Sequence, residues 1–303
     1  MRPGFRDSPS GASRAFERSW SCARRVSRLE GVPPYLYFVV SAVFHYLGPA
    51  LAVLLFARID ALGVAWLRIL TAAVVFAVWR RPRLIPSRLL IAWGAVLAAM
   101  NSVFYLAIDR LPLGTVAAIE FLPVIVLAAV AARTRRNVLA LVAAAGGVAL
   151  LSDVRLVAEP LGFVFAAVNA VLFALYIVLG HRVARSSVVP GIDGLALSMM
   201  IAALMALPFG VGPALPAFTD PALLAAAAGV GLCSSVIPYV ADQLAMARLA
   251  RGTYALMVSL LPAVATVIGV IVLAQVPSPA EIAGVLLVVA GVALGSPPRE
   301  DMA

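Results

Sequence analysis

Long apolar runs separated by short polar interruptions make up the chain from about residue 34 to about residue 295. Each run is close to the ~20 residues that a helix needs to cross a hydrocarbon core about 30 Å thick. The runs do not form one face of an amphipathic pattern, as they would in a soluble domain. A membrane β-barrel would instead show segments of about 10 residues with alternating polarity. The pattern therefore predicts an all-α integral membrane protein.

Ten membrane-spanning helices are expected, because Pro, Gly and charged residues interrupt the apolar runs nine times. The fifth span is short, and the eighth contains Pro238. The expected ranges are 34–56, 61–79, 88–107, 113–132, 137–152, 160–181, 192–211, 221–247, 252–273 and 279–295. The composition also indicates a membrane protein, since 63% of the residues are hydrophobic and only 12% are charged.

The basic residues are distributed unevenly between the two sides of the membrane. All 23 are arginine, and 19 of them lie in the two tails and in alternate loops. The opposite loops hold three, Arg58, Arg110 and Arg155, while Arg68 lies inside a span. Positive charge gathers on the cytoplasmic side of membrane proteins. We therefore expect both termini to be cytoplasmic, with residues 1–33 forming a basic, disordered tail.

Charge and motifs also limit the partners. The net charge of +9 does not indicate a nucleic-acid partner, because the arginines lie where membrane topology requires them. The sequence contains no P-loop, so no ATPase subunit is implied. Cys22 and Cys233 stand far apart, and no spacing of ligand residues indicates a metal or another cofactor. The expected partners are the lipid bilayer, a small-molecule substrate and a coupling proton.

A short sequence that interrupts the apolar pattern occurs twice. "LAIDRLPLGT" at residues 106–115 and "LAMARLARGT" at residues 244–253 are identical at six of ten positions. Weaker echoes link the starts of the first and sixth spans, "FVVSAV" and "FVFAAV", and the ends of the fifth and tenth, "GVAL" in both. The echoes follow the same order in both halves.

This order predicts two five-helix repeats, residues 34–152 and 160–295, followed by a short cytoplasmic C-terminal tail at 296–303. Because five is odd, the second repeat enters the membrane inverted relative to the first. Inverted repeats are typical of secondary transporters, in which two similar halves expose a central site to each side in turn. An integral-membrane enzyme or scaffold has no comparable need for this symmetry.

The sequence resembles EamA-type transporters of the drug/metabolite transporter superfamily, with the threonine and homoserine exporters as the most similar branch. The resemblance rests on "MNSVFYLAIDRLPLGTVAAIEFLPVIVLAAV" (100–130), "SSVIPYVADQLAMARLARGTYALMVSLLPA" (234–263) and "WLRILTAAVV" (66–75). It implies a ten-helix bundle that exports small metabolites, often amino acids, driven by the proton gradient. Two positions depart from the family pattern: Leu261 stands where a Glu is common, and Ala274-Gln275 replaces a Gly-Glu pair.

Three ionisable residues inside the spans are candidates for substrate binding or coupling, because each costs roughly 2.5–3.5 kcal/mol at mid-bilayer. Glu120 lies near the middle of the fourth span and would bind a proton or an amine. Arg68 in the second span would pair with Glu120 or receive a substrate carboxylate. Asp242 in the eighth span would face the cavity or pair with Arg248 or Arg251. A purely structural hydrogen bond or ion pair is the alternative for each.

Other polar residues of the spans are weaker candidates. Asn101 and Asn169 would contact the substrate or join neighbouring helices by hydrogen bonds. His45 would titrate near neutral pH at the site or serve as a packing partner. Tyr105, Tyr176 and Tyr239 would line the cavity or pack in the core. Pro123 and Pro262 occupy related positions in the two repeats and are the expected hinges.

The sequence thus predicts a secondary transporter, not an enzyme, in a bacterial plasma (inner) membrane. It would export a small polar metabolite, most simply an amino acid such as threonine or homoserine, by alternating access. The same fold carrying drug-like cations or a nucleotide-sugar remains an alternative, although Arg68 is the only basic residue inside a span. A pore is disfavoured, because no ring of like charges is visible.

The orientation is tested by reporter fusions. We expect alkaline phosphatase, which is active only outside the cytoplasm, to be active after Arg155 and inactive after Arg83. Green fluorescent protein fused after Ala303 should fluoresce, because it folds in the cytoplasm. The opposite pattern of activities would contradict the expected orientation.

Overall fold

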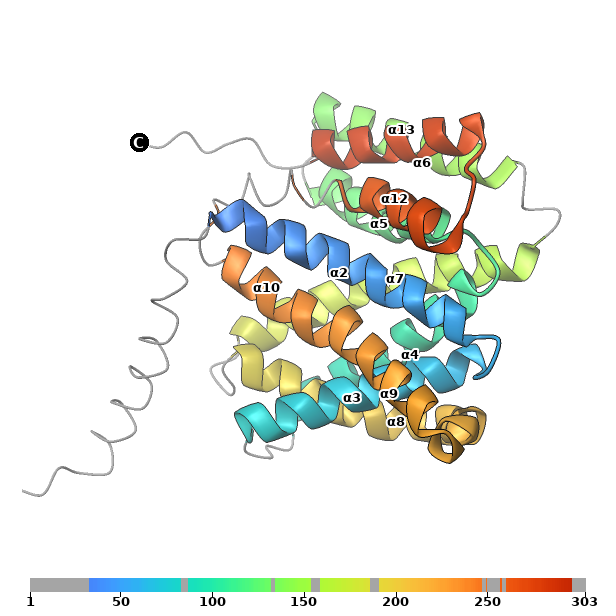
Figure 1. The fold of residues 1–303 in the computed structure, drawn as a ribbon. Helices are drawn as coiled ribbons and strands as arrows, with labels where there is room; N and C mark the ends of the chain where they lie inside the picture. The colour runs from blue at the N-terminus through green and yellow to red at the C-terminus, as the bar shows by residue number, and fades with distance from the viewer. Residues whose placement is uncertain are drawn as a thin grey trace, which may run out of the picture.

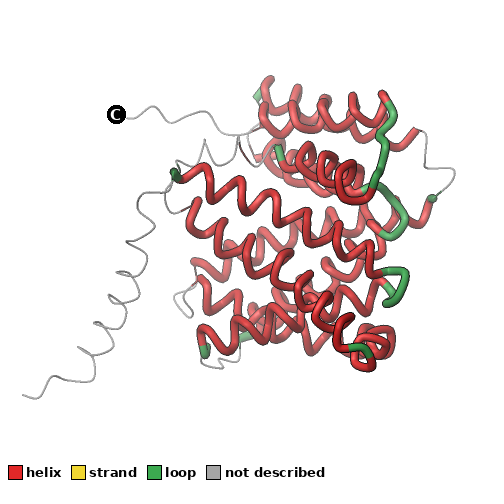
Figure 2. Tube along the Cα trace, viewed as in Figure 1, coloured by secondary structure: helices red, strands yellow, loops and turns green. Residues whose placement is uncertain are grey.

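The structure of the chain is a computed structural model, and it describes residues 33–82, 87–131, 134–153, 159–185, 191–246 and 260–295, with positions 249 and 257. Helices joined by short turns make up this part of the chain, which contains no strand (Figure 2). Nearly all of the expected N-terminal tail and the whole expected C-terminal tail lie outside the described residues.

The described helices form ten spans, as the sequence predicts, with α9, η2 and α10 following one another as a single span. They are α2 (Pro34–Leu55), α3 (Ala61–Arg80), α4 (Arg88–Ile108), α5 (Leu113–Ala131), α6 (Arg135–Asp153), α7 (Pro160–Arg185), α8 (Gly191–Thr219), α9 (Pro221–Gly231), η2 (Leu232–Val236), α10 (Ile237–Met246), α12 (Leu261–Leu273) and α13 (Pro279–Gly295).

The seventh span is longer than expected. It continues to Thr219, although three prolines lie inside it, at 208, 213 and 216. An interior proline removes one helical hydrogen bond and is usually destabilising. Here the added turns pack closely against α3, where Ala214 and Ala217 are fully buried. Burial of these turns offsets the lost hydrogen bonds.

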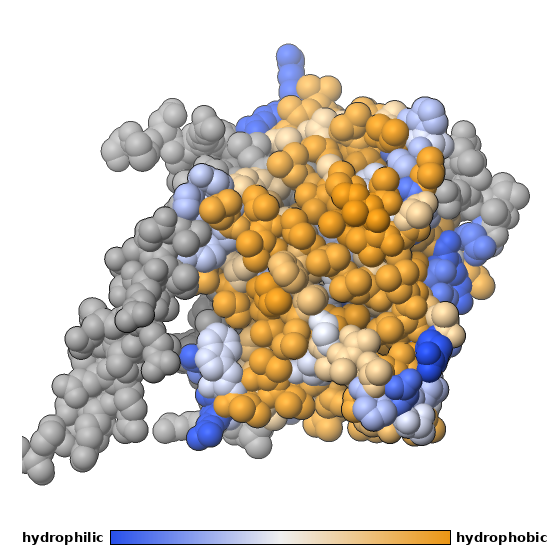
Figure 3. Space-filling model, in the orientation of Figure 1, coloured by the Kyte–Doolittle hydropathy of each residue, from blue (hydrophilic) through white to orange (hydrophobic). Residues whose placement is uncertain are grey.

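The surface of the described helices is suited to lipid. Six spans are long and apolar enough to cross a membrane, namely α2, α3, α4, α7, α8 and the span from α9 to α10. Shorter apolar helices cover Leu113–Pro123, Leu261–Leu273 and Pro279–Leu294. On the face shown in Figure 3, apolar residues form a broad area across the middle, and hydrophilic residues lie toward its edges. The chain is therefore a multi-pass membrane protein.

The two halves interleave, and their contacts follow the repeat. The central pairs join counterparts directly: α3 packs on α8, α5 on α12 and α6 on α13. Other contacts occur as matched pairs, so that α4 on α7 corresponds to α10 on α2, and α5 on α7 corresponds to α12 on α2. Figure 1 shows α2 and α7 running in opposite directions. The arrangement is the inverted repeat that the sequence echoes predict.

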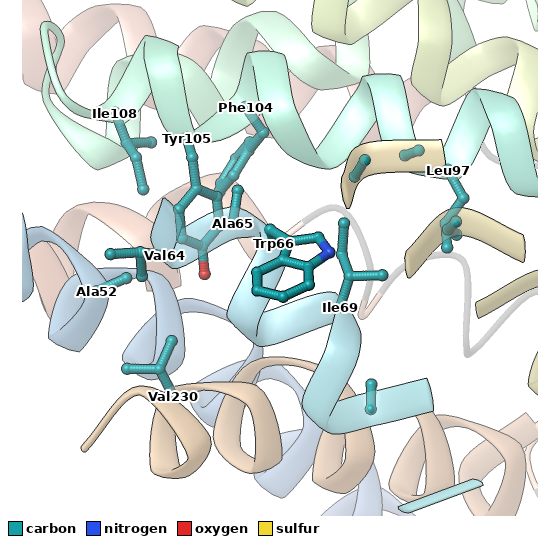
Figure 4. Close-up of a cluster of buried hydrophobic side chains, with 14 of the residues drawn as sticks. Ala52, Val64, Ala65, Trp66, Ile69, Leu97, Phe104, Tyr105, Ile108 and Val230 are labelled. Atoms are coloured by element: carbon teal, nitrogen blue, oxygen red, sulfur yellow. The ribbon is translucent and has the colours of Figure 1, made fainter. Parts of the chain in front are cut away.

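The α3–α8 pair is the most closely packed contact between the halves near the core shown in Figure 4. The Trp66 indole N–H donates to the carbonyl of Ala203 at 2.9 Å. A Cβ at Gly210 would lie only 2.2 Å from the Trp66 Cβ, so glycine is required there for the two helices to approach. An ion pair joins Arg80 of α3 to Asp193 of α8 at 2.8 Å, and a second joins Arg58, in the turn before α3, to Asp220, the residue just after α8, at 3.1 Å.

The close approach at Gly210 gives a stability prediction. We expect Gly210→Ala to lower the free energy of unfolding by about 1–3 kcal/mol, because the added methyl group overpacks against Trp66. Gly212→Ala is the matched control, since nothing lies within 4 Å of its Cβ position. Thermal unfolding in detergent measures both. Equal melting temperatures for the two variants would contradict the packing argument.

Candidate functional site

Arg68 is buried in α3, with 6% of its surface exposed. Its Nε donates to the Ser235 hydroxyl at 3.0 Å, and its Nη2 donates to the Ser234 carbonyl at 3.0 Å. The guanidinium also lies 5.5 Å from the centre of the Tyr105 ring. The cation is therefore fixed by neutral groups of the eighth span and by an aromatic face.

Pro238 explains why the Ser234 carbonyl is available. In an α-helix this carbonyl would accept a hydrogen bond from the N–H of residue 238, and proline has none. The helix also widens into the π-helical turn η2 just before the proline. Ser234 and Ser235 were not identified from the sequence. The sequence did contain an indication of this contact. The backbone carbonyl four residues before a mid-span proline lacks its helical N–H donor and can accept a hydrogen bond from another group.

Glu120 is buried in α5, with 7% of its surface exposed. The amide Nδ2 of Asn169 in α7 donates to its Oε1 at 3.2 Å, and Asn169 itself is fully buried. This contact joins a helix of the first half to one of the second. Two residues that the sequence singled out separately thus form one pair.

Arg68 and Glu120 do not form an ion pair with each other in the described structure. The charge of Arg68 nevertheless acts on Glu120 and also on His45, Tyr105 and Tyr239. The site therefore holds a buried guanidinium and a buried carboxyl group, each hydrogen-bonded to neutral groups. One ligand carrying both charges could neutralise both residues.

Among the described residues, two buried polar atoms at this site have no hydrogen-bond partner: the hydroxyl of Tyr46 and the Oδ1 of Asn169. The Tyr105 hydroxyl, which points away from α4 in Figure 4, interacts with Ser234 and Arg68. Leaving a buried polar group unbonded costs about 1–3 kcal/mol, so native structures usually bond it to a ligand or water. The charge of Glu120 acts on Tyr46. The sequence did not single out Tyr46, because a tyrosine inside a span is as common in a packed core as in a binding site.

The remaining candidates lie at varying distances from this centre. The His45 ring packs edge-on against Tyr46, with 5.3 Å between ring centres. Tyr239 is hydrogen-bonded to Tyr176, and the charge of Asp242 acts on both tyrosines. Arg248 and Arg251, the expected partners of Asp242, lie outside the described residues.

Asn101 does not join the site through any contact among the described residues. Its Nδ2 donates at 2.8 Å to the carbonyl of Leu97, one turn earlier in the same helix. This hydrogen bond of the buried amide lies within α4 and joins no neighbouring helix, so the substrate contact of Asn101 stays a prediction.

Known proteins resemble the chain over most of its length. The model of the EamA-like transporter family matches residues 160–296. The threonine/homoserine exporter RhtA of Escherichia coli (strain K12) is 30% identical over 244 residues, which cover 78% of this chain and 81% of RhtA. RhtA of Salmonella typhimurium (strain LT2) is 28% identical and covers 85% of this chain and 89% of its own.

The chain belongs to the EamA-like transporter family. A solved crystal structure with 19% sequence identity shares its fold, with a TM-score of 0.59 over 87% of this chain and 98% of the other. The family model does not cover the first repeat. The assignment of this repeat to the same family is supported by the longer alignments with RhtA and by the shared fold.

The two expected hinges differ in this EamA-like transporter. Pro123 lies inside α5, three residues beyond Glu120. Pro262 occupies the first turn of the described helix α12, which begins at Leu261. A proline is readily accommodated in the first turn of a helix, because the N–H it lacks would have no helical partner there. Most of the expected ninth span before residue 260 lies outside the described residues, so both hinges stay predictions.

The hydrogen bond from Arg68 to Ser235 gives a second stability prediction. We expect Ser235→Ala to lower the free energy of unfolding by about 1.5–3 kcal/mol, since it removes an acceptor from a buried charged donor. The control is Ser102→Ala, whose hydroxyl bonds only to the Ala98 carbonyl of its own helix. If the two variants unfold at the same temperature in detergent, Ser235 does not stabilise the buried arginine.

Proposed function

We propose that this transporter exports a small zwitterionic metabolite across the bacterial inner membrane, with amino acids such as threonine or homoserine as cargo. The observation that carries the proposal is that Arg68 and Glu120, two buried residues of opposite charge type, are hydrogen-bonded to neutral groups and form no ion pair among the described residues. A free amino acid offers a carboxylate to Arg68 and an ammonium group to Glu120. The relatives named threonine/homoserine exporters support the same class of cargo.

The buried charges favour a small cargo with one anionic group. Arg68 is the only buried basic side chain among the described residues. A phosphorylated cargo such as a nucleotide-sugar carries several negative charges and would need more cations in the site. The Tyr46 hydroxyl, which has no hydrogen-bond partner among the described residues, provides a neutral hydrogen-bonding group for the rest of the cargo.

The mechanism we propose is alternating access driven by protons. The two interleaved repeats would exchange conformations and open the Arg68–Glu120 site first to the cytoplasm and then to the outside. Glu120 is the candidate coupling residue, because a carboxylate can bind either the ammonium group of the cargo or a proton. Both termini would lie in the cytoplasm.

Substitution of the two charged residues tests the proposal. We expect Glu120→Gln and Arg68→Gln each to reduce export about tenfold or more, since loss of one buried charge contact costs about 2–5 kcal/mol and 1.4 kcal/mol is tenfold. Matched controls are Glu159→Gln and Arg58→Gln, which change exposed residues. Cells loaded with a panel of amino acids provide the efflux measurement, with membrane expression checked for each variant.

Two outcomes of this experiment would count against the proposal. Normal export by well-expressed Glu120→Gln and Arg68→Gln would remove these residues from the site. Failure of the unmodified transporter to export any amino acid, combined with export of cationic drugs, would favour the alternative cargo. Proton coupling is tested separately: a protonophore should abolish export against a cargo gradient.

A further inference from the structure

A cavity of about 380 Å³ lies at the end of the bundle opposite the N-terminus of α2. Its walls come from the turn between α4 and α5, the first turn of α5, α12, the turn between α12 and α13, and the start of α13. The volume is within the range of about 300–1,000 Å³ that holds small ligands. The Arg68–Glu120 site is not part of its lining.

The cavity is lined by polar groups from both halves of the chain. Asp109, Arg110 and Thr115 come from the first half, and Thr266, Gln275 and Glu281 come from the second. Such a mixture of cationic, anionic and hydroxyl groups suits a zwitterion better than a lipid tail. Glu281 is buried despite its charge, with 6% of its surface exposed.

Arg110 is held in place at the cavity wall. Its Nη1 donates to the Leu106 carbonyl at 2.8 Å and to the Asp109 carboxylate at 3.2 Å. Its guanidinium also lies 5.2 Å from the centre of the Phe165 ring. These contacts fix an arginine that would otherwise extend into solvent, so its remaining donors are pre-organised for an anionic group.

Two residues of the cavity lining, Gly114 in α5 and Thr266 in α12, lie in close contact. A Cβ at Gly114 would lie 2.2 Å from the Thr266 hydroxyl oxygen, so α5 and α12 touch at this level. The Gln275 side chain crosses the same gap and accepts a hydrogen bond from the Leu113 N–H at 3.3 Å. Glu120 lies six residues beyond Gly114, which is about 9 Å along a helix.

We propose that this cavity is a second cargo site, in which the exported zwitterion is held by Arg110 after it leaves Glu120 and before it reaches the outside. The proposal rests on the proposed function, because it takes the same cargo. Cargo passes from the central site to the outer site when the contact of Gly114 with Thr266 opens. The same cavity binds amino acid that is supplied from outside.

Cysteine labelling in intact cells tests the outer site. The chain has two cysteines, so Cys22→Ser and Cys233→Ala provide a cysteine-free background. Thr266→Cys places a reporter in the cavity wall, and Val276→Cys, at a residue with 86% of its surface exposed, reports access of the reagent. A membrane-impermeant thiol reagent is added outside, with and without external L-threonine.

We expect external L-threonine to slow labelling of Thr266→Cys by about threefold at a concentration twice its dissociation constant. Protection should persist when Arg68→Gln disables the central site, and it should be lost with Arg110→Gln. Arg58→Gln is the matched control, since Arg58 also pairs with one aspartate outside the cavity, and protection should remain. This pattern assigns the protection to the outer cavity.

Several results would overturn the outer site. Labelling of Val276→Cys without labelling of Thr266→Cys would show that the cavity is closed to the outside. Absence of protection in a transporter that still exports threonine would refute the outer site alone. Protection that Arg68→Gln removes, or that Arg110→Gln leaves intact, would assign the effect to the central site. Absence of both protection and amino-acid export would refute the proposed function as well.

Discussion

The centre of the molecule depends on a buried guanidinium, that of Arg68, which has no carboxylate partner among the described residues. Arg68 lies inside a membrane span, where burying an isolated charge costs free energy. Its hydrogen bonds are donated to neutral oxygens of Ser234 and Ser235 in the eighth span. One of these oxygens is available because Pro238 cannot donate to it. The same proline that weakens the helix therefore supplies the acceptor that holds the cation. Neutral acceptors reduce the desolvation cost of burying the Arg68 cation, but they do not neutralise its positive charge. An anionic group of a ligand could therefore still bind it favourably.

This site requires close contact between the two halves of the chain. Arg68 in the first half reaches Ser234 and Ser235 in the second, and Glu120 in the first half reaches Asn169 in the second. Glycines at the helix contacts make this possible, since a Cβ at Gly48 would meet Ser234 and a Cβ at Gly210 would meet Trp66. The interleaving thus places each charged residue beside partners that lie far away in the sequence. A relative movement of the halves would change these contacts, as alternating access requires.

The polar residues also define a direction through the protein. The charge of Asp242 acts on Tyr176 and Tyr239, and α10, which carries Tyr239 and Asp242, contacts the first half of α2 through the hydrogen bond from Ser41 to the Pro238 carbonyl. The outer cavity lies at the end of the bundle opposite the N-terminus of α2, with Gly114 and Thr266 in its lining. Gln275, where the family pattern has a glutamate, provides a neutral acceptor at the first turn of α5. A neutral group holds this turn less tightly than a charged one would, because charge-assisted hydrogen bonds are stronger.

The sequence by itself determined the membrane class, the ten spans and the inverted repeat. These features follow from the length of apolar runs and from an odd number of spans per repeat, both of which are local or periodic properties. It also identified Arg68, Glu120 and Asn169, because a polar residue inside a bilayer span needs a compensating interaction. Only the tertiary structure decided which partners they have, since Asn169 binds Glu120 whereas Asn101 binds its own helix. It also placed Tyr46 and Ser234 at the site and showed the cavity beside the turn between α4 and α5. Such contacts join residues that are remote in the chain, and their geometry is set by helix packing that no local pattern encodes.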